Sequence, residues 1–385
     1  MASDLTLDSL LREAIKTTKL DDFGSTLFLE GLQILINSIN GEANLNDIGF
    51  QIVRGTISQS LANRLKIQDW ITRHPEILNE EIAKPLIITG LPRTGSTFLQ
   101  TLLSIDPANR GLHHWEAEKP CPPPELVYSV TDSRIQEMHQ KIQVIEMMKP
   151  GIQAIHPMDA GGYAQCNVLL NNEFKSAYFT IMAWAPIYDE WYYSCDMNSA
   201  YAYHKVILQL LQWRLPSEGW VLKSPGHLPW LDCLFNQYPD AQVIFTHRDP
   251  SKVVHSSSSL VSAIHSMGSD KVDIKRNAAY QSRVLSGEMD KAMKLRERLS
   301  SEAFFDLQFL DLINDPIKAV ERIYEYFGRD LSPGHKKRMQ VWIRDNPPGK
   351  RGRHRYSSED IGIEPDMVRK NFKEYQERFQ VPIEK

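Results

Sequence analysis

The sequence predicts an α/β fold: a doubly wound parallel sheet flanked by helices, with an N-terminal helical layer. Short apolar segments that suit buried parallel strands alternate with segments of helical pattern. A glycine-containing loop joins the first of these strands to a helix-like segment. Before that strand, the chain repeats apolar side chains at helical spacing. Together these three observations predict the layers of the fold.

Residues 1–83 form the predicted helical layer. Apolar residues recur at helical spacing in LDSLLREAI (7–15), and STLFLEGLQILINSI (25–39) repeats the pattern. A third helical segment runs from about residue 49 to near Pro75. We expect this region to pack on the core that follows it.

Residues 84–385 form the predicted α/β domain. The four candidate strands are KPLIITG (84–90), WVLKSP (220–225), AQVIFTH (241–247) and AFFDLQFL (303–310). A well-patterned helix, IKAVERIYEYFG, ends at Gly328, and the chain from residue 346 reads as a basic loop. At about 125–215 we expect a helical insertion whose many aromatic residues form either core or an apolar acceptor pocket.

Composition excludes several classes of protein. Of the 385 residues, 42% are hydrophobic and 24% charged, which is typical of globular proteins and not of collagen-like or disordered chains. The net charge of −4 argues against a nucleic-acid partner. The four cysteines form no CxxC pair, so we expect neither a disulfide framework nor a zinc site. With no signal peptide and no apolar run of about 20 residues, we expect a cytoplasmic protein that does not span a membrane.

The segment from Gly90 to Thr97, GLPRTGST, is the most informative one. It follows a predicted strand and opens a predicted helix, where backbone N–H groups bind phosphate oxygens. Its G-x-x-x-x-G spacing is that of a P-loop, so the predicted sheet is of the P-loop type, but Ser96 stands where that loop has its lysine. Arg93 inside the loop suits an anion that needs no metal. The alternative is a strand–turn–helix corner with incidental glycines.

A second polar segment, THRDP (246–250), closes another predicted strand. Arg248 stands at the strand end and Ser256 follows eight residues later. Since ligands of open α/β sheets bind beyond the carboxyl ends of the strands, Arg248 is expected to face the same crevice as the loop. The alternative is an arginine paired with Asp249 or a neighbouring acid, with serines that only cap a helix.

Together the two segments resemble the PAPS-dependent sulfotransferases, in the bacterial small-molecule branch and distantly the tyrosylprotein sulfotransferases. The resemblance implies PAPS (3′-phosphoadenosine 5′-phosphosulfate) as co-substrate, adenosine 3′,5′-bisphosphate as product, and no metal. It also implies a basic element near 350 that grips the 3′-phosphate. The implied donor-binding residues are Arg93, Thr94, Gly95, Ser96, Thr97, Arg248, Ser256, Lys350, Arg351 and Gly352. Many relatives carry a tyrosine where this chain has Phe309, so no adenine contact is assigned to it.

Sulfuryl transfer needs a base for the acceptor and a cation beside the leaving oxygen. The segment HHWEAE (113–118) contains four candidate bases. By resemblance we predict Glu116, with His113, His114 and Glu118 as alternatives. Lys223, at the end of an apolar strand, is the predicted cation, and Arg93 assists it.

The function predicted is transfer of a sulfuryl group from PAPS to a hydroxyl of a small-molecule acceptor, with an amine as the second choice. The protein would act as a monomer or a homodimer. The alternatives are a P-loop kinase or NTPase, against which the missing lysine argues, and a non-catalytic nucleotide-binding module.

Overall fold

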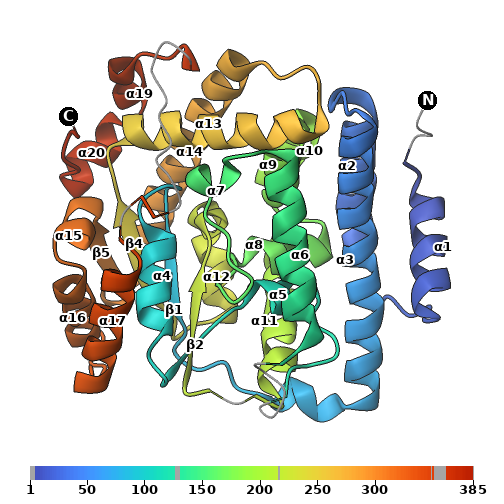
Figure 1. The fold of residues 1–385 in the computed structure, drawn as a ribbon, viewed down its shortest axis with the longest axis horizontal. Helices are drawn as coiled ribbons and strands as arrows, with labels where there is room; N and C mark the ends of the chain where they lie inside the picture. Colours follow the sequence, from blue (N-terminus) through green and yellow to red (C-terminus); the bar gives the residue numbers. More distant parts are fainter. Residues whose placement is uncertain (1–4, 126–130, 216, 348, 351–360, 385) are drawn as a thin grey trace.

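The computed structural model describes residues 5–125, 131–215, 217–347, 349–350 and 361–384. Within these residues five parallel strands form one sheet in the order β2-β3-β1-β4-β5 (Figure 1). The strands are β1 (Leu86–Gly90), β2 (Asn109–Gly111), β3 (Gly219–Lys223), β4 (Gln242–His247) and β5 (Phe304–Gln308). The predicted α/β class with a parallel sheet is confirmed.

The central strand β1 brings the site segments together. Ile88 of β1 pairs with Lys223 of β3, and Gly90 pairs with Thr246 of β4. The carboxyl ends of the three strands therefore lie side by side. The chain leaves β1 toward the β2 edge of the sheet and leaves β4 toward the β5 edge, so this is the point where open α/β sheets bind ligands.

All four predicted strands are present within two residues of their expected bounds. Sequence reasoning missed β2, because its three residues, Asn109, Arg110 and Gly111, show neither an apolar run nor an alternation.

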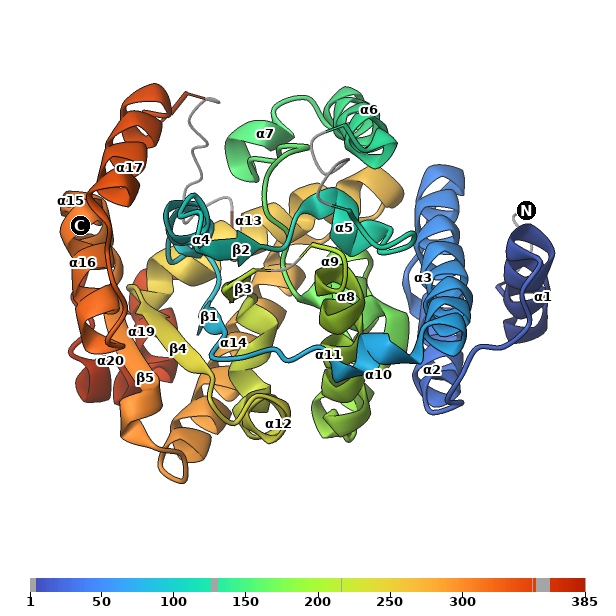
Figure 2. The ribbon, with the colours of Figure 1, turned by 90° about the horizontal axis from the view of Figure 1, so that it is seen from below.

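Helices cover both faces of the sheet. Figure 2 shows α4 (Ser96–Ser104) on one face and α12 (Leu231–Gln237) with α14 (Ile274–Arg296) on the other. The long helix α13 (Pro250–Gly268) follows β4. The other helices after β1 are α5 (His114–Glu118), α6 (Ser133–Met148), α7 (Ile152–Ile155), α8 (Asn167–Leu170), α9 (Tyr178–Met182), α10 (Pro186–Ser194), α11 (Asn198–Gln212), α15 (Phe309–Asn314), α16 (Pro316–Tyr326), α17 (Pro333–Asp345), α19 (Pro365–Asn371) and α20 (Lys373–Phe379). Short 3₁₀ turns lie at Pro75–Asn79, Asn171–Glu173, Pro225–Trp230 and Ser301–Ala303.

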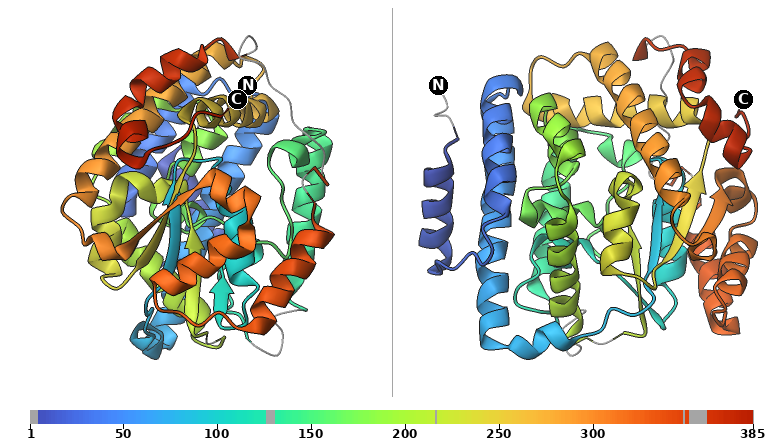
Figure 3. Two further views of the ribbon diagram at one scale, coloured as in Figure 1. Left: turned by 90° about the vertical axis from the view of Figure 1, so that its left-hand side faces the viewer. Right: turned by 180° about the vertical axis from the view of Figure 1, so that it is seen from behind.

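The N-terminal helices α1 (Leu7–Thr18), α2 (Phe28–Glu42) and α3 (Asp47–Arg73) stand at one end of the molecule, opposite α15–α20 (Figure 3). Leu61 of α3 is fully buried and belongs to the same apolar cluster as Ile87 of β1. The helices thus share one continuous core with the sheet. The division of the chain into two regions at 83/84 stays a prediction.

The aromatic residues of the segment between β2 and β3 are mostly core. Phe179, Tyr188, Tyr192 and Tyr201 are at most 1% exposed. All four cysteines are free thiols. No helix in the described ranges is both long and apolar enough to cross a membrane.

Candidate functional site

The loop between β1 and α4 leaves the first N–H groups of α4 open. Gly95 is the N-cap residue, with φ of +79°, and it has no side chain to bond those N–H groups. Gly90 has φ of +135°, and a Cβ there would lie 2.4 Å from the carbonyl oxygen of Thr246. Only glycine permits this approach, so Gly90 holds the loop tightly against β4. The result is an anion-binding helix start at the carboxyl edge of the sheet.

Thr94 supports this loop from inside. Its hydroxyl is buried, donates to the carbonyl of Leu91 at 2.9 Å and bonds the hydroxyl of Thr246 at 2.7 Å. The side chain therefore serves the fold, and only its backbone N–H remains for a ligand. The predicted residues Ser96 and Thr97 begin α4, where Thr97 is exposed.

Lys223 points at this helix start from the end of β3. Its ammonium donates to the Thr97 hydroxyl at 3.3 Å, and the residue is 2% exposed. Lys223 is in no ion pair with a carboxylate among the described residues. Burial is the main cause that lowers the pKa of Lys223 to about 7, and the charge of Arg93 adds to it. A buried lysine without a carboxylate partner is stabilised by a bound anion, so the start of α4 beside Lys223 suits one.

Arg93, Arg248 and Ser256 also meet at this edge, as predicted from their positions. Arg93 has φ of +65°, and its Nε donates to the Ser256 hydroxyl at 3.0 Å. The Nη1 of Arg248 donates to the backbone carbonyl of Arg93 at 2.7 Å. The two arginines thus lie on one side of the molecule and contact each other at the carboxyl edge of the sheet.

Arg248 is also in an ion pair. Its Nε and Nη2 donate to the two carboxylate oxygens of Glu384 at 2.8 and 3.0 Å. The guanidinium lies 3.9 Å over the ring of Phe309, in a cation–π contact. The alternative expectation, an arginine paired with a neighbouring acid, therefore describes this structure, although the acid is Glu384 and not Asp249.

The geometry argues against the predicted base, Glu116. Its side chain is fully buried in α5, and one oxygen accepts from Arg110 at 2.7 Å. The other oxygen accepts from the backbone N–H of His113 at 3.2 Å, in a capping box. Arg110 in turn binds the carbonyls of Leu211 and Leu215. Both carboxylate oxygens are thus engaged in contacts within the fold.

Two of the alternative bases also contact other residues. The ring Nδ1 of His113 bonds the carbonyl of Gly161 at 3.0 Å, and the ring stacks beside Trp115. Glu118 accepts from the Lys141 ammonium at 2.5 Å. The ion pair with Lys141 engages Glu118, whereas His113 donates through Nδ1 and its Nε2 lone pair has no described partner, so His113 and His114 both remain candidates in the segment.

His114 and His156 differ from the other histidines that the structure describes. The other nine each have a ring nitrogen in a hydrogen bond, whereas the rings of His114 and His156 have none among the described residues. Burial and then the charge of Lys223 lower the pKa of His114 to about 4. Burial, Lys223 and Arg93 lower the pKa of His156 to about 3. Both rings are therefore neutral at pH 7 and lie beside the cations at this edge of the sheet.

Sequence reasoning missed His156. It follows α7, whose last residue, Ile155, accepts at its carbonyl from Nη2 of Arg93 at 2.8 Å. No motif in its segment, GIQAIHPMDA, points to this position, because only the folding of α7 onto the loop brings the two together.

A model of the sulfotransferase family matches residues 85–333, which include β1, the loop, Lys223, Arg248 and Ser256. The chain belongs to the sulfotransferase family.

Similar proteins agree with this assignment. The chain is 24% identical over 294 residues to the omega-hydroxy-beta-dihydromenaquinone-9 sulfotransferase Stf3 of Mycobacterium bovis, covering 72% of this chain and 71% of Stf3. The crystal structure of sulfotransferase STF9 from Mycobacterium avium superposes with a TM-score of 0.91 at 28% identity, covering 100% of this chain and 99% of STF9. Sulfotransferase STF1 from Mycobacterium tuberculosis superposes with a TM-score of 0.86 at 32% identity, covering 97% and 99% of the two chains. The fold is therefore that of these sulfotransferases over nearly the whole chain.

The third phosphate element predicted for this sulfotransferase-family chain is only partly described. The Lys350 ammonium donates to the carbonyl of Asp345 and the side chain of Asn346, at 3.0 and 3.1 Å, so its described contacts are local. Arg351 and Gly352 lie outside the described residues. This element stays a prediction.

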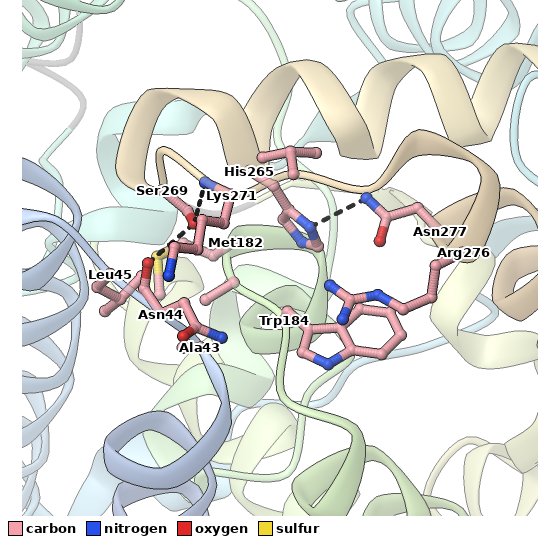
Figure 4. A pocket seen from close by; sticks show the side chains of 12 residues that line it. Ala43, Asn44, Leu45, Met182, Trp184, His265, Ser269, Lys271, Arg276 and Asn277 are labelled. Atoms are coloured by element: carbon pink, nitrogen blue, oxygen red, sulfur yellow. Dashed lines mark hydrogen bonds between the residues drawn. The ribbon is translucent and has the colours of Figure 1, made fainter. Parts of the chain in front are cut away.

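A shallow pocket lies apart from the candidate site. It is formed by the segment after α2 (residues 43–45), the far end of α13, the start of α14 and the turn after α9 (Figure 4). Arg276 stacks over Trp184 at 3.9 Å there, and His265 bonds Asn277 (Figure 4). None of the predicted site residues lines it.

Proposed function

We propose that this chain transfers the sulfuryl group of PAPS to a hydroxyl of a small-molecule acceptor. The observation that carries the proposal is the Lys223 ammonium, buried without a carboxylate partner and directed at the first turn of α4. Such a cation suits the bridging oxygen between the sulfonate and the 5′-phosphate, where charge develops as the bond breaks. Arg93 and the open N–H groups of α4 suit the oxyanions on either side.

The donor's other end would bind at Arg248 and Ser256, with Lys350, Arg351 and Gly352 completing the grip on the 3′-phosphate. The contact between Arg93 and Ser256 supports this assignment, because it makes the two anion sites continuous. Selection of a 3′-phosphate distinguishes PAPS from ATP. The Ser96 in place of the P-loop lysine supports the same choice over a kinase.

His114 takes the role of base in this proposal, in place of Glu116. The acceptor oxygen attacks sulfur in line with the leaving 5′-phosphate oxygen, the new O–S bond forms as the bridging S–O bond breaks, and the acceptor proton passes to the imidazole. The ring of His114 is neutral at pH 7 and makes no hydrogen bond to a described residue, so it is free to accept that proton. His156 has the same features and is the second candidate.

A hydroxyl acceptor agrees with the name of the similar Stf3, an omega-hydroxy-beta-dihydromenaquinone-9 sulfotransferase. We also propose a cytoplasmic location and a monomer or homodimer, without a nucleic-acid partner. The four free cysteines support a reducing compartment.

The experiment is incubation with labelled PAPS and a panel of hydroxylated small molecules and lipid extracts. Mass spectrometry then follows the gain of one SO₃ group, about 80 Da, on an acceptor. Product that disappears in Lys223→Met and His114→Asn supports the proposal. Binding of adenosine 3′,5′-bisphosphate with no transfer to any acceptor would favour a non-catalytic module instead.

A further inference from the structure

The guanidinium of Arg248 already holds an anion supplied by the chain itself. The two oxygens of Glu384 accept from its Nε and Nη2 in a bidentate pair, with the two side chains only 19% and 15% exposed. A guanidinium binds carboxylate and phosphate oxygens through the same pair of donors. Glu384 and a 3′-phosphate would therefore compete for one face of Arg248.

Arg248 does not depend on Glu384 for its position. Its Nη1 donates to the carbonyl of Arg93 at 2.7 Å, and its backbone N–H donates to the Tyr375 hydroxyl at 3.2 Å. The guanidinium also lies 3.9 Å over the ring of Phe309. The contacts with Arg93 and Phe309 hold the guanidinium next to the loop when the carboxylate is absent, and the contact with Tyr375 holds the backbone of Arg248.

The segment that carries Glu384 is lightly attached. Val381, just after α20, is 6% exposed, but Pro382 is exposed and Ile383 is 65% exposed. The backbone N–H of Glu384 donates to Asp249 at 2.9 Å. Beyond Val381 the segment is thus held through the polar contacts of Glu384, which water or another anion can replace.

We propose that Glu384 is a displaceable internal anion: its carboxylate occupies the Arg248 site in the free protein and leaves when the 3′-phosphate of the donor or product binds. The inference rests on the proposed function, because it takes Arg248 as the 3′-phosphate ligand. Residues 381–384 then form a latch that opens on nucleotide binding.

The latch raises the apparent Kd for the nucleotide, which equals the intrinsic Kd divided by the fraction of time that the latch is open. If it is closed for about nine-tenths of the time, the apparent Kd for adenosine 3′,5′-bisphosphate is about tenfold above the intrinsic one. Opening of the latch should also expose the backbone N–H of Glu384 to solvent. Its acceptor, Asp249, remains in place because it caps α13 and pairs with Arg369.

The experiment compares wild type, Glu384→Ala and the control Glu377→Ala by isothermal titration with adenosine 3′,5′-bisphosphate. Glu377 is matched because it is an acid of the neighbouring α20, 67% exposed, that pairs only with Lys373 in the described contacts. We expect about tenfold tighter binding in Glu384→Ala, no change in Glu377→Ala, and no gain in any variant for adenosine 5′-phosphate. Unchanged or weaker binding in Glu384→Ala would overturn the latch.

A second measurement needs no variant. Hydrogen exchange of the Glu384 amide in the wild-type chain should become faster on saturation with adenosine 3′,5′-bisphosphate, and a constant rate would overturn the latch. Arg248→Ala in the same titration separates the two proposals. If it binds as tightly as wild type, the 3′-phosphate assignment fails; if it binds weakly while Glu384→Ala gains nothing, only the latch fails.

Discussion

Replacing Glu116 by Gln distinguishes a structural carboxylate from a catalytic one. The change removes one charge from a buried pair and leaves Arg110, which is 8% exposed, without its partner. Breaking a buried ion pair in this way costs about 3–5 kcal/mol. For a chain of 385 residues this lowers Tm by about 4–6 °C. We therefore expect Glu116→Gln to lose stability and, well below its Tm, to keep kcat within about threefold.

The matched variant, His114→Asn, should lose activity while keeping its stability. Its ring makes no hydrogen bond to a described residue, so its Tm should stay within about 1 °C, whereas loss of a general base lowers kcat by about 10²–10⁴-fold. Thermal unfolding and steady-state sulfation on the same preparations measure both quantities. A Glu116→Gln variant with unchanged Tm and a kcat at least 100-fold lower would refute the reasoning and return the base to Glu116.

Three further predictions concern the candidate site. Lys223→Met should lower kcat by about 10²–10³-fold without lowering Tm, since it removes a buried charge that has no carboxylate partner; a large loss of Tm would contradict this. The pH profile of kcat/KM should rise near pH 4, where His114 loses its proton, and fall near pH 7, where Lys223 loses its proton. Because the bound donor anions stabilise the Lys223 ammonium, kcat should fall at a higher pH than kcat/KM does. If kcat and kcat/KM fell at the same pH, that result would argue against Lys223. Gly90→Ala should weaken binding of adenosine 3′,5′-bisphosphate more than tenfold in a titration, because its Cβ would lie 2.4 Å from the Thr246 carbonyl; normal affinity would show that the loop does not need this approach.

The fold was largely predictable because its strands are short apolar runs with clear ends. The runs at 84–90 and 241–247 became β1 and β4 with almost the same bounds. The edge strand β2 could not be found, since a three-residue polar strand is defined by its pairing with β3 and not by its side chains. Sequence-based strand prediction relies on runs or alternations of apolar residues, and the residues of β2 form neither.

The site was predictable as a set of segments but not as a set of side-chain directions. The location of the base in the segment HHWEAE stays a prediction, and the capping box of α5, which turns Glu116 inward, could not be read from the sequence. His156 and Glu384 meet the loop and Arg248 only through tertiary packing, across 63 and 136 residues of chain from Arg93 and Arg248. Neither has a local signal that spacing could reveal.

The most direct test of the central claim is calorimetric titration of the wild-type chain with adenosine 3′,5′-bisphosphate without divalent metal, against ATP with Mg²⁺. The candidate site, with Lys223, Arg93 and Arg248 around one anion path, predicts binding of the bisphosphate at least 100-fold tighter than that of ATP. Equal affinities, or tighter binding of the magnesium complex of ATP, would contradict the account.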